Sequence, residues 1–314
     1  PISTSSVYDM ISHLPEEVNF THYLLIQIFG VMSNTMFKRF RANYYPLPKV
    51  WFDLWADLRQ ETGRARILAP LKTMEYIIKW TWGQENFDRP VRIPRRTFRY
   101  GWRADGERLD RGTKLSTHGL EQALRFLTTH GLLVESWAEG ADGPSFLPRL
   151  RPDSDPSVAH PQPDVSRTGF RPPETNTFPV PIIWTDVTHD VSSEALILAT
   201  EYFFRHTWGW QGDDDARWMD IDEIANGRRY RSPERRGERR DRGIRYSERR
   251  LRSALREGLR RGWLVRRCTE WGRHQYALHI ARVSVAADDS ALHRILSAAR
   301  TTVRQSLDRT RGTR

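Results

Sequence analysis

The chain has 314 residues, of which 38% are hydrophobic and 28% charged, and its formal net charge is +11. This length favours two or three compact domains, and the longest apolar stretch, residues 23–32, is too short to cross a bilayer. The single cysteine, Cys268, excludes an intramolecular disulfide and leaves a zinc site short of ligands, so any core must be stable without either.

The N-terminal segment, residues 1–44, has apolar residues at helical spacing, among them Val7, Met10, Ile11 and Leu14, and we expect a helical extension there. The start of the chain lacks the pattern of a signal peptide, which favours a cytoplasmic protein. A similar apolar stripe after Val285 predicts a basic C-terminal helix or tail. The expected organisation is therefore the extension 1–44, a first domain 45–150, a Pro/Asp/Ser-rich linker 151–176, a second domain 177–285 and the tail 286–314.

An internal repeat supports the two central domains. Six of the seven residues from Gly106 to Gly112 recur from Gly237 to Gly243, and the same spacing of 131 then relates Ser116 to Ser247 and Val134 to Val265. Two upstream blocks recur in the same order: residues 45–48 match 178–181, and 81–83 match 207–209. The chain is therefore predicted to contain two copies of one unit. A structural interpretation of the repeated Gly-Glu-Arg-x-Asp-Arg-Gly is that Asp110 and Asp241 pair with a neighbouring arginine and hold a loop closed.

The elements of the unit are clearest in the second copy. Ser192 or Ser193 is expected to cap a first helix that ends near Gly209. A short strand at 218–219 precedes a second helix over 220–226, which stops at Gly227. Pro94 and Gly101 take the places of Asp220 and Gly227 in the first copy. A third helix capped by Ser247 and two strands, 263–269 and 274–280, follow. This order predicts a mainly α protein with small β wings (α+β), built as two tandem winged helix-turn-helix domains.

Positive charge is concentrated in the second copy. Residues 226–267 contain seventeen arginines and five acidic residues, whereas the rest of the chain is close to neutral. Such a field attracts polyanions, and duplex DNA is the expected partner. In a winged helix the third helix enters the major groove, and the long loop before it is interpreted as lying along phosphates or in the minor groove. The alternative for 228–240 is a solvated, disordered arginine run. The predicted DNA-binding residues are Arg228, Arg229, Arg231, Arg235, Arg236, Arg239, Arg240, Arg245, Arg249, Arg250, Arg252, Ser253, Arg256 and Arg273.

The first copy is less basic at the same positions and is expected either to bind DNA more weakly or to serve as a protein interface. Its candidate residues are Arg99, Arg103, Lys114, His118, Gln122 and Arg125.

The blocks Phe178–Pro181, Arg205–Trp210 and Gly243–Ser247, with the helix and strand from Leu251 to Leu264, resemble the N-terminal DNA-binding domain of phage replication initiator O. The tandem arrangement is similar to the paired winged helices of plasmid replication initiators. The resemblance implies an origin-binding protein of a mobile element. Besides DNA, the expected partners are a second copy of the chain or replication proteins, bound through the first domain or the terminal helices, and no membrane is expected.

Three classes of function remain open at this stage. The first is an origin- or operator-binding protein, with replication initiation ahead of transcriptional regulation. The second is a single-strand binder, which needs exposed aromatics among the arginines, for which Tyr230 and Tyr246 are the candidates. The third is a protein-interaction adaptor. We expect no catalytic residues, no metal and no cofactor, because phosphate-loop and metal-ligand spacings are missing from the sequence.

Overall fold

The computed structural model describes residues 44–63, 67–84, 89–104, 107–137, 143–149, 177–208, 217–230 and 233–280. The predicted helices at the two ends of the chain, the predicted linker 151–176, Gly209 and Arg231 lie outside these residues. No helix of the described part is long and apolar enough to cross a membrane.

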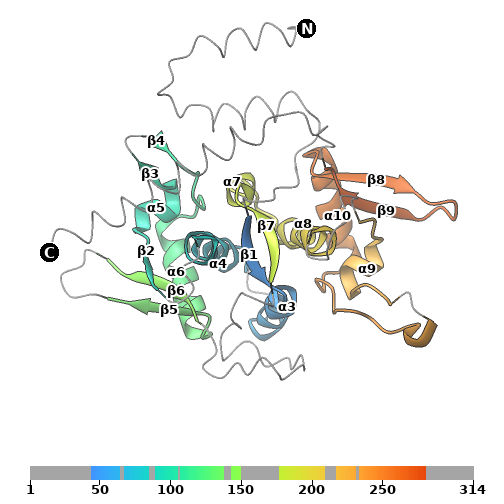
Figure 1. Ribbon diagram of the computed structural model, residues 1–314, viewed down its shortest axis with the longest axis horizontal. Coiled ribbons are helices and arrows are strands. Elements are labelled where there is room, and N and C mark those ends of the chain that lie inside the picture. Colours follow the sequence, from blue (N-terminus) through green and yellow to red (C-terminus); the bar gives the residue numbers. More distant parts are fainter. Residues whose placement is uncertain are drawn as a thin grey trace, which may run out of the picture.

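Helices dominate the described chain, and its strands form small sheets (Figure 1). The first half contains β1 (Tyr44–Pro48), α3 (Trp51–Glu61), α4 (Leu68–Trp80), the 3-10 helix η1 (Trp82–Gln84), β2 (Val91–Arg92), α5 (Arg95–Tyr100), β3 (Arg103–Ala104), β4 (Glu107–Arg108), α6 (Thr117–Thr129), β5 (Leu133–Ser136) and β6 (Ser145–Pro148). The second half contains β7 (Thr177–Pro181), α7 (Trp184–Val187), α8 (Glu194–Thr207), α9 (Ile221–Asn226), η2 (Pro233–Arg235), α10 (Glu248–Arg260), β8 (Leu264–Cys268) and β9 (His274–Leu278).

The predicted helix starts are confirmed in most details. The Ser193 hydroxyl accepts a hydrogen bond from the Leu196 amide at the start of α8, and Asp220 forms a reciprocal capping box with Glu223 at the start of α9. Ser247 stands at the N-cap of α10, but its side chain accepts no hydrogen bond there. Gly101 and Gly227 end α5 and α9 with φ of 85° and 91°, where a side chain would collide with the carbonyl of Asp110 or Asp241.

Each half carries the same small sheet, which lies beside α6 in the first half and beside α10 in the second. In the first half the strand order is β2-β6-β5, so the strand before α5 pairs with the last strand of the hairpin. In the second half β8 and β9 form the hairpin, and Met219 makes an isolated bridge to Tyr276 in β9. The strand predicted at 218–219 is thus present as one residue pair.

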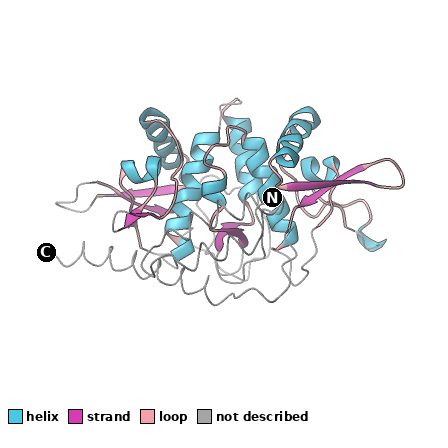
Figure 2. Ribbon diagram, turned by 90° about the horizontal axis from the view of Figure 1, so that it is seen from above, coloured by secondary structure: helices cyan, strands magenta, loops and turns pink. Residues whose placement is uncertain are grey.

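The two halves meet through an antiparallel pair of strands, β1 and β7. Pro46 pairs with Pro179, its own counterpart in the repeat, while Tyr45 faces Val180 and Leu47 faces Phe178. A segment that pairs with its own repeat in this way is related to it by an approximate twofold axis. In Figure 1 a half-turn about the viewing direction exchanges α4 with α8, α3 with α7, and the β5–β6 hairpin with the β8–β9 hairpin. Figure 2 shows the resulting left-right correspondence from above.

The short helices that follow these central strands contact the opposite halves. From α3, Asp57 accepts ion pairs from Arg242 (3.3 Å) and Arg245 (3.6 Å) of the second half. The counterpart of Asp57 just after α7, Asp190, receives Arg111 (2.9 Å) and Lys114 (2.5 Å) of the first half. Buried side chains of both halves form one hydrophobic core, so the two units predicted from the repeat are interlocked rather than separately packed.

The core at this junction encloses two glutamates at equivalent positions of α4 and α8. Glu75 and Glu201 are both fully buried. The oxygens of Glu201 accept hydrogen bonds from the indoles of Trp51 (2.8 Å) and Trp184 (2.9 Å), which are themselves counterparts. Burial raises the pKa of Glu75 far above its ordinary value, and repulsion from Glu201 adds to the effect. A protonated Glu75 can therefore donate to Glu201 across the pseudo-symmetric centre.

The repeated aspartates hold their loops, but through different partners from those predicted. Asp110 accepts from the Tyr76 hydroxyl (2.9 Å), the Trp80 indole (3.1 Å) and the Gly112 amide (2.9 Å). Asp241 accepts from the hydroxyl of Tyr202, the counterpart of Tyr76, at 2.6 Å and from the Gly243 amide at 2.9 Å. Side chains of α4 in the first half and of α8 in the second half take the place of the expected arginine. Each loop is therefore fastened to the core.

Candidate nucleic-acid interface

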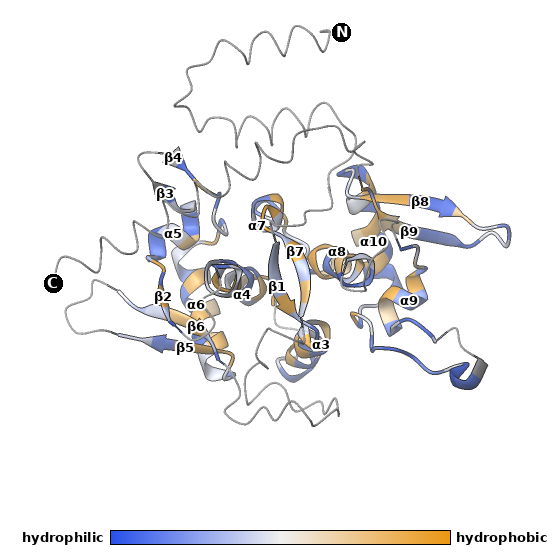
Figure 3. Cartoon of the chain, viewed as in Figure 1, coloured by the Kyte–Doolittle hydropathy of each residue, from blue (hydrophilic) through white to orange (hydrophobic). Residues whose placement is uncertain are grey.

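Helix α10 separates an apolar face from an arginine-rich face. Leu251, Ala254, Leu255 and Gly258 are buried. The remaining positions carry a second set of side chains, which are exposed and were all predicted to bind DNA: Arg249, Arg250, Arg252, Ser253 and Arg256. The helix thus presents a polar, cationic surface to solvent. Figure 3 shows the same division over the molecule, with apolar residues along the central helices and hydrophilic colour on the outer hairpin and loop.

The arginines of α10 differ in whether a neighbouring carboxylate already pairs with them. Arg250 forms an ion pair with Glu194 (2.7 Å) and lies over the Tyr246 ring, and Arg252 pairs with Glu248 at 2.5 Å. Arg249 has no partner among the described residues. The Arg256 guanidinium bonds only to a backbone carbonyl, that of Arg252, at 3.3 Å. Arg249 and Arg256, with Ser253 between them, are therefore the α10 side chains best placed to meet an external anion or base edge.

The arginine-rich loop before α10 is more ordered and more neutralised than the sequence suggests. Arg228 is buried, 8% exposed, beside Glu223, so it lies beneath the surface rather than along a phosphate. Arg229 and Arg239 both contact Asp222, at 3.4 and 3.1 Å. Arg235 pairs with Glu238 at 2.7 Å. The disordered alternative is not what the described part of this loop adopts.

Two further loop arginines complete the set. The Arg240 amide donates to the Arg228 carbonyl at 2.6 Å, which holds the two sides of the loop together. Arg236 is exposed, with no ion pair to any described residue. Among the described arginines of this loop, it is the one most open to phosphate.

Arg245 and Lys114 have a structural role that sequence reasoning did not anticipate. They occupy equivalent positions, both have left-handed backbone (φ 52° and 58°), and each forms an ion pair with the opposite half, with Asp57 and Asp190. Their contribution to nucleic-acid binding is correspondingly reduced, because an exposed charge already paired attracts phosphate less.

The β8–β9 hairpin adds residues that the sequence prediction missed. Arg273 was predicted and is exposed at the turn, but Arg266 on β8 is exposed as well, and Trp271 at the tip is 81% exposed. Only the first residue of β8 is buried, so both faces of the outer part of the hairpin meet solvent and Arg266 is exposed together with the turn. In Figure 1 this hairpin and the segment with η2 project from one end of the molecule, on either side of α9.

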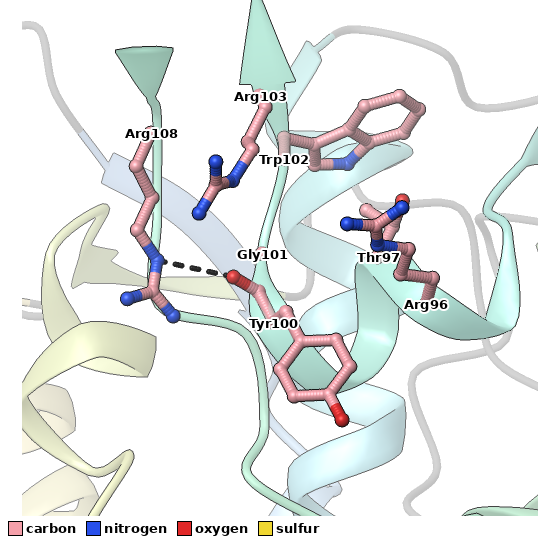
Figure 4. A pocket seen from close by; sticks show the side chains of 7 residues that line it. All are labelled: Arg96, Thr97, Tyr100, Gly101, Trp102, Arg103 and Arg108. Atoms are coloured by element: carbon pink, nitrogen blue, oxygen red, sulfur yellow. Dashed lines mark hydrogen bonds between the residues drawn. The ribbon is translucent and has the colours of Figure 1, made fainter. Parts of the chain in front are cut away.

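In the first half the equivalent helix α6 exposes His118, Gln122 and Arg125. Arg99 is engaged by the Leu115 carbonyl and the Thr117 hydroxyl. Arg103 is separate from α6: it lies in a cavity of about 680 Å³ lined by Arg96, Thr97, Tyr100, Gly101, Trp102, Arg103 and Arg108 (Figure 4). The sequence therefore grouped residues that the fold divides between two surfaces.

The two aromatics predicted to serve a single-strand binder, Tyr230 and Tyr246, are not open. The Tyr230 ring lies under the Arg235 guanidinium at 3.6 Å. Tyr246 is only 6% exposed and is covered by Arg59 at 3.7 Å. Stacking bases would have to displace both arginines, so these two rings do not favour single-strand binding.

Comparisons with known proteins give no further information about the site. No protein family model matches the sequence, and no curated protein or solved structure matches it either. Within the described residues, no group of three or more His, Cys, Asp or Glu side chains is placed to hold a metal ion. The interface must be judged from its own geometry.

Proposed function

We propose that the protein binds double-stranded DNA through two winged-helix halves. The observation that carries the proposal is the exposed Arg249–Ser253–Arg256 surface of α10, which stands in the position of a recognition helix. Support for the winged-helix assignment comes from the element order of each half and from the pairing of β2 with β6 in the first half and of Met219 with Tyr276 of β9 in the second.

The approximate twofold relation extends the proposal to the shape of the DNA site. A twofold rotation keeps equivalent elements at the same height along its axis, so α6 and α10 lie at the same level of the molecule, on either side of the β1–β7 pair (Figure 1). Two recognition helices arranged in this way suit two half-sites in opposite orientation. Because α6 presents His118, Gln122 and Arg125 where α10 presents Arg249, Ser253 and Arg256, the half-sites are expected to differ. One chain would then bind an imperfect inverted repeat.

The role in the cell follows from the resemblance to phage and plasmid initiators and is part of the same proposal: an origin-binding replication initiator of a mobile element. Transcriptional regulation would use the same surface. Sequencing the DNA that copurifies with the chain distinguishes the two roles. An initiator should enrich an origin of replication, and a regulator should enrich a promoter.

The direct test uses the full chain and duplexes selected from a random library. The double variant Arg249→Ala/Arg256→Ala should bind the selected duplex at least tenfold more weakly. The slope of log affinity against log salt should flatten by roughly 0.9 for each phosphate that the variant no longer neutralises. Arg260→Ala is the matched control, because Arg260 is an exposed arginine of the same helix that is already paired with Glu257. Equal binding by the double variant and the wild type would refute the assignment of α10.

A further inference from the structure

The cavity in the first half becomes informative when it is compared with its own counterpart in the second half. Helices α5 and α9 have the same length, begin after Pro94 and Asp220, and end at Gly101 and Gly227. Beyond them, Arg103 pairs with Arg108 across β3 and β4, and Arg229 bridges Arg239 in the same way. Arg103 therefore corresponds to Arg229, and Arg108 to Arg239.

In the second half this arginine pair is neutralised from within. Asp222, in the first turn of α9, contacts Arg229 at 3.4 Å and Arg239 at 3.1 Å. Arg239 also donates to the Gly227 carbonyl, at 2.6 Å. Hydrogen bonds and the nearby arginines lower the pKa of Asp222, with Asn226 the largest contributor, so this carboxylate stays charged. One internal anion thus holds two guanidinium groups together.

In the first half the position of Asp222 is occupied by Arg96. Arg103 and Arg108 therefore line the cavity without a counterpart of the Asp222 carboxylate, and Arg96 adds a third positive charge. Among the described residues no carboxylate lies within ion-pair distance of Arg96, Arg103 or Arg108. Three cations that line one cavity repel one another, and an anion bound between them removes this repulsion.

The cavity is also shaped to receive such an anion. The Arg108 guanidinium is fixed by the carbonyls of Tyr100 and Asp110, both at 3.0 Å, and of Arg111 at 3.2 Å. In the view of Figure 4, Arg103 lies between Arg108 and Arg96 and points toward Arg108, while the Tyr100 ring lies apart from them, below Gly101. Tyr100 also lines the cavity and is 50% exposed; the Arg99 guanidinium lies 4.9 Å from the centre of its ring, so a base would have to stack on the opposite side.

We propose that this cavity binds the phosphate group of a nucleotide, with Arg96, Arg103 and Arg108 as its ligands and Tyr100 available to stack on the base. Guanidinium groups match phosphate oxygens in charge and geometry. An adjacent aromatic ring favours a phosphate that carries a nucleobase. The phosphate comes either from a free mononucleotide or from the backbone of bound DNA, and only this second source rests on the proposed function.

The test titrates the full chain with adenosine 5′-monophosphate, inorganic phosphate and adenosine by calorimetry. The monophosphate should bind most tightly and adenosine not at all. Arg96→Asp copies the arrangement of the second half, so it should fold normally and weaken monophosphate binding at least tenfold. Arg95→Asp is the control, since Arg95 is the exposed neighbour on α5 and does not line the cavity. Arg103→Gln is a second variant that should lose binding independently of any effect of Arg96→Asp on folding.

Duplex titrations identify the source. If the mononucleotide does not bind, but Arg96→Asp flattens the salt dependence of duplex binding relative to Arg95→Asp, the phosphate belongs to the DNA backbone. If neither mononucleotide binding nor the salt slope responds to Arg96→Asp and Arg103→Gln, the proposal is overturned. A chain that binds the mononucleotide but no duplex would refute the proposed function and leave this site standing.

Discussion

Replacing Glu75 with glutamine should remove a pH dependence of stability that originates at the junction of the two halves. Glu75 is fully buried against Glu201, and burial raises its pKa well above the 4.5 of an ordinary glutamate, with repulsion from Glu201 as the next cause. The folded chain therefore keeps a proton that the unfolded chain releases. The stabilisation is complete below pH about 4.5 and is lost as the pH rises toward the folded pKa.

The magnitude follows from one retained proton. The unfolding free energy falls by about 1.4 kcal/mol per pH unit while the proton is bound in the folded chain and released in the unfolded one. The measurement therefore covers pH 5 to 7.5, where the unfolded glutamate has largely released its proton. Glutamine keeps a donor toward Glu201 but has no proton to release. The stability of Glu75→Gln relative to wild type should therefore rise steadily over this range. Burial lowers the pKa of Lys72 to about 8, which is why the range stops at pH 7.5.

The assay is urea unfolding of the full chain at half-unit steps from pH 5 to 7.5, followed by tryptophan fluorescence. Glu121→Gln makes the same chemical change at an exposed glutamate of α6 and should leave the pH dependence unchanged. If the curves for Glu75→Gln and wild type are parallel throughout, the buried glutamates do not hold a retained proton and this account of the junction fails.

Three other outcomes follow from the same structure. Asp241→Asn should lower the unfolding free energy by about 2–4 kcal/mol, because buried Tyr202 and the Gly243 amide lose a charged acceptor; a denaturant titration showing no loss would contradict this. Separate chains covering 44–150 and 177–280 should assemble as a one-to-one complex on size exclusion, whereas two folded, non-associating monomers would exclude the interlocked arrangement. Asp222→Arg should expose Arg229 and Arg239 and create a second mononucleotide site, so that calorimetry reports two sites per chain instead of one.

Much of the local structure could be predicted because its causes are local. Ser193 as an N-cap and Gly227 as a positive-φ stop act within a few residues, and each appears at its predicted place. The repeat predicted that both halves carry the same elements, since equal side-chain patterns make equal demands on the backbone.

The relation between the halves could not be predicted, because it depends on contacts between residues far apart in the sequence. Trp51 and Glu201 are 150 residues apart, and the arginines of the repeated motif find their carboxylates on the opposite half. The sequence of Tyr45–Pro48 is that of an ordinary short strand, and nothing in it indicates that it pairs with its own repeat copy in the other half. The repeat showed that the unit occurs twice, but not that each copy completes the other.

Formal charge also misleads about where an anion can bind, and the two halves show why. The second half has the arginine excess, yet Asp222, Glu238, Glu194, Glu248 and Asp57 neutralise much of it in place. The first half has fewer arginines, but at the cavity beside α5 one substitution relative to its counterpart, arginine for aspartate, removes the internal anion and adds a cation. Binding energy toward phosphate depends on the charge that remains unpaired and on how well it is fixed. By that measure Arg249 and Arg256 on α10 and the three arginines of the first-half cavity are the principal anion-binding groups, although the sequence pointed first to the loop between α9 and α10.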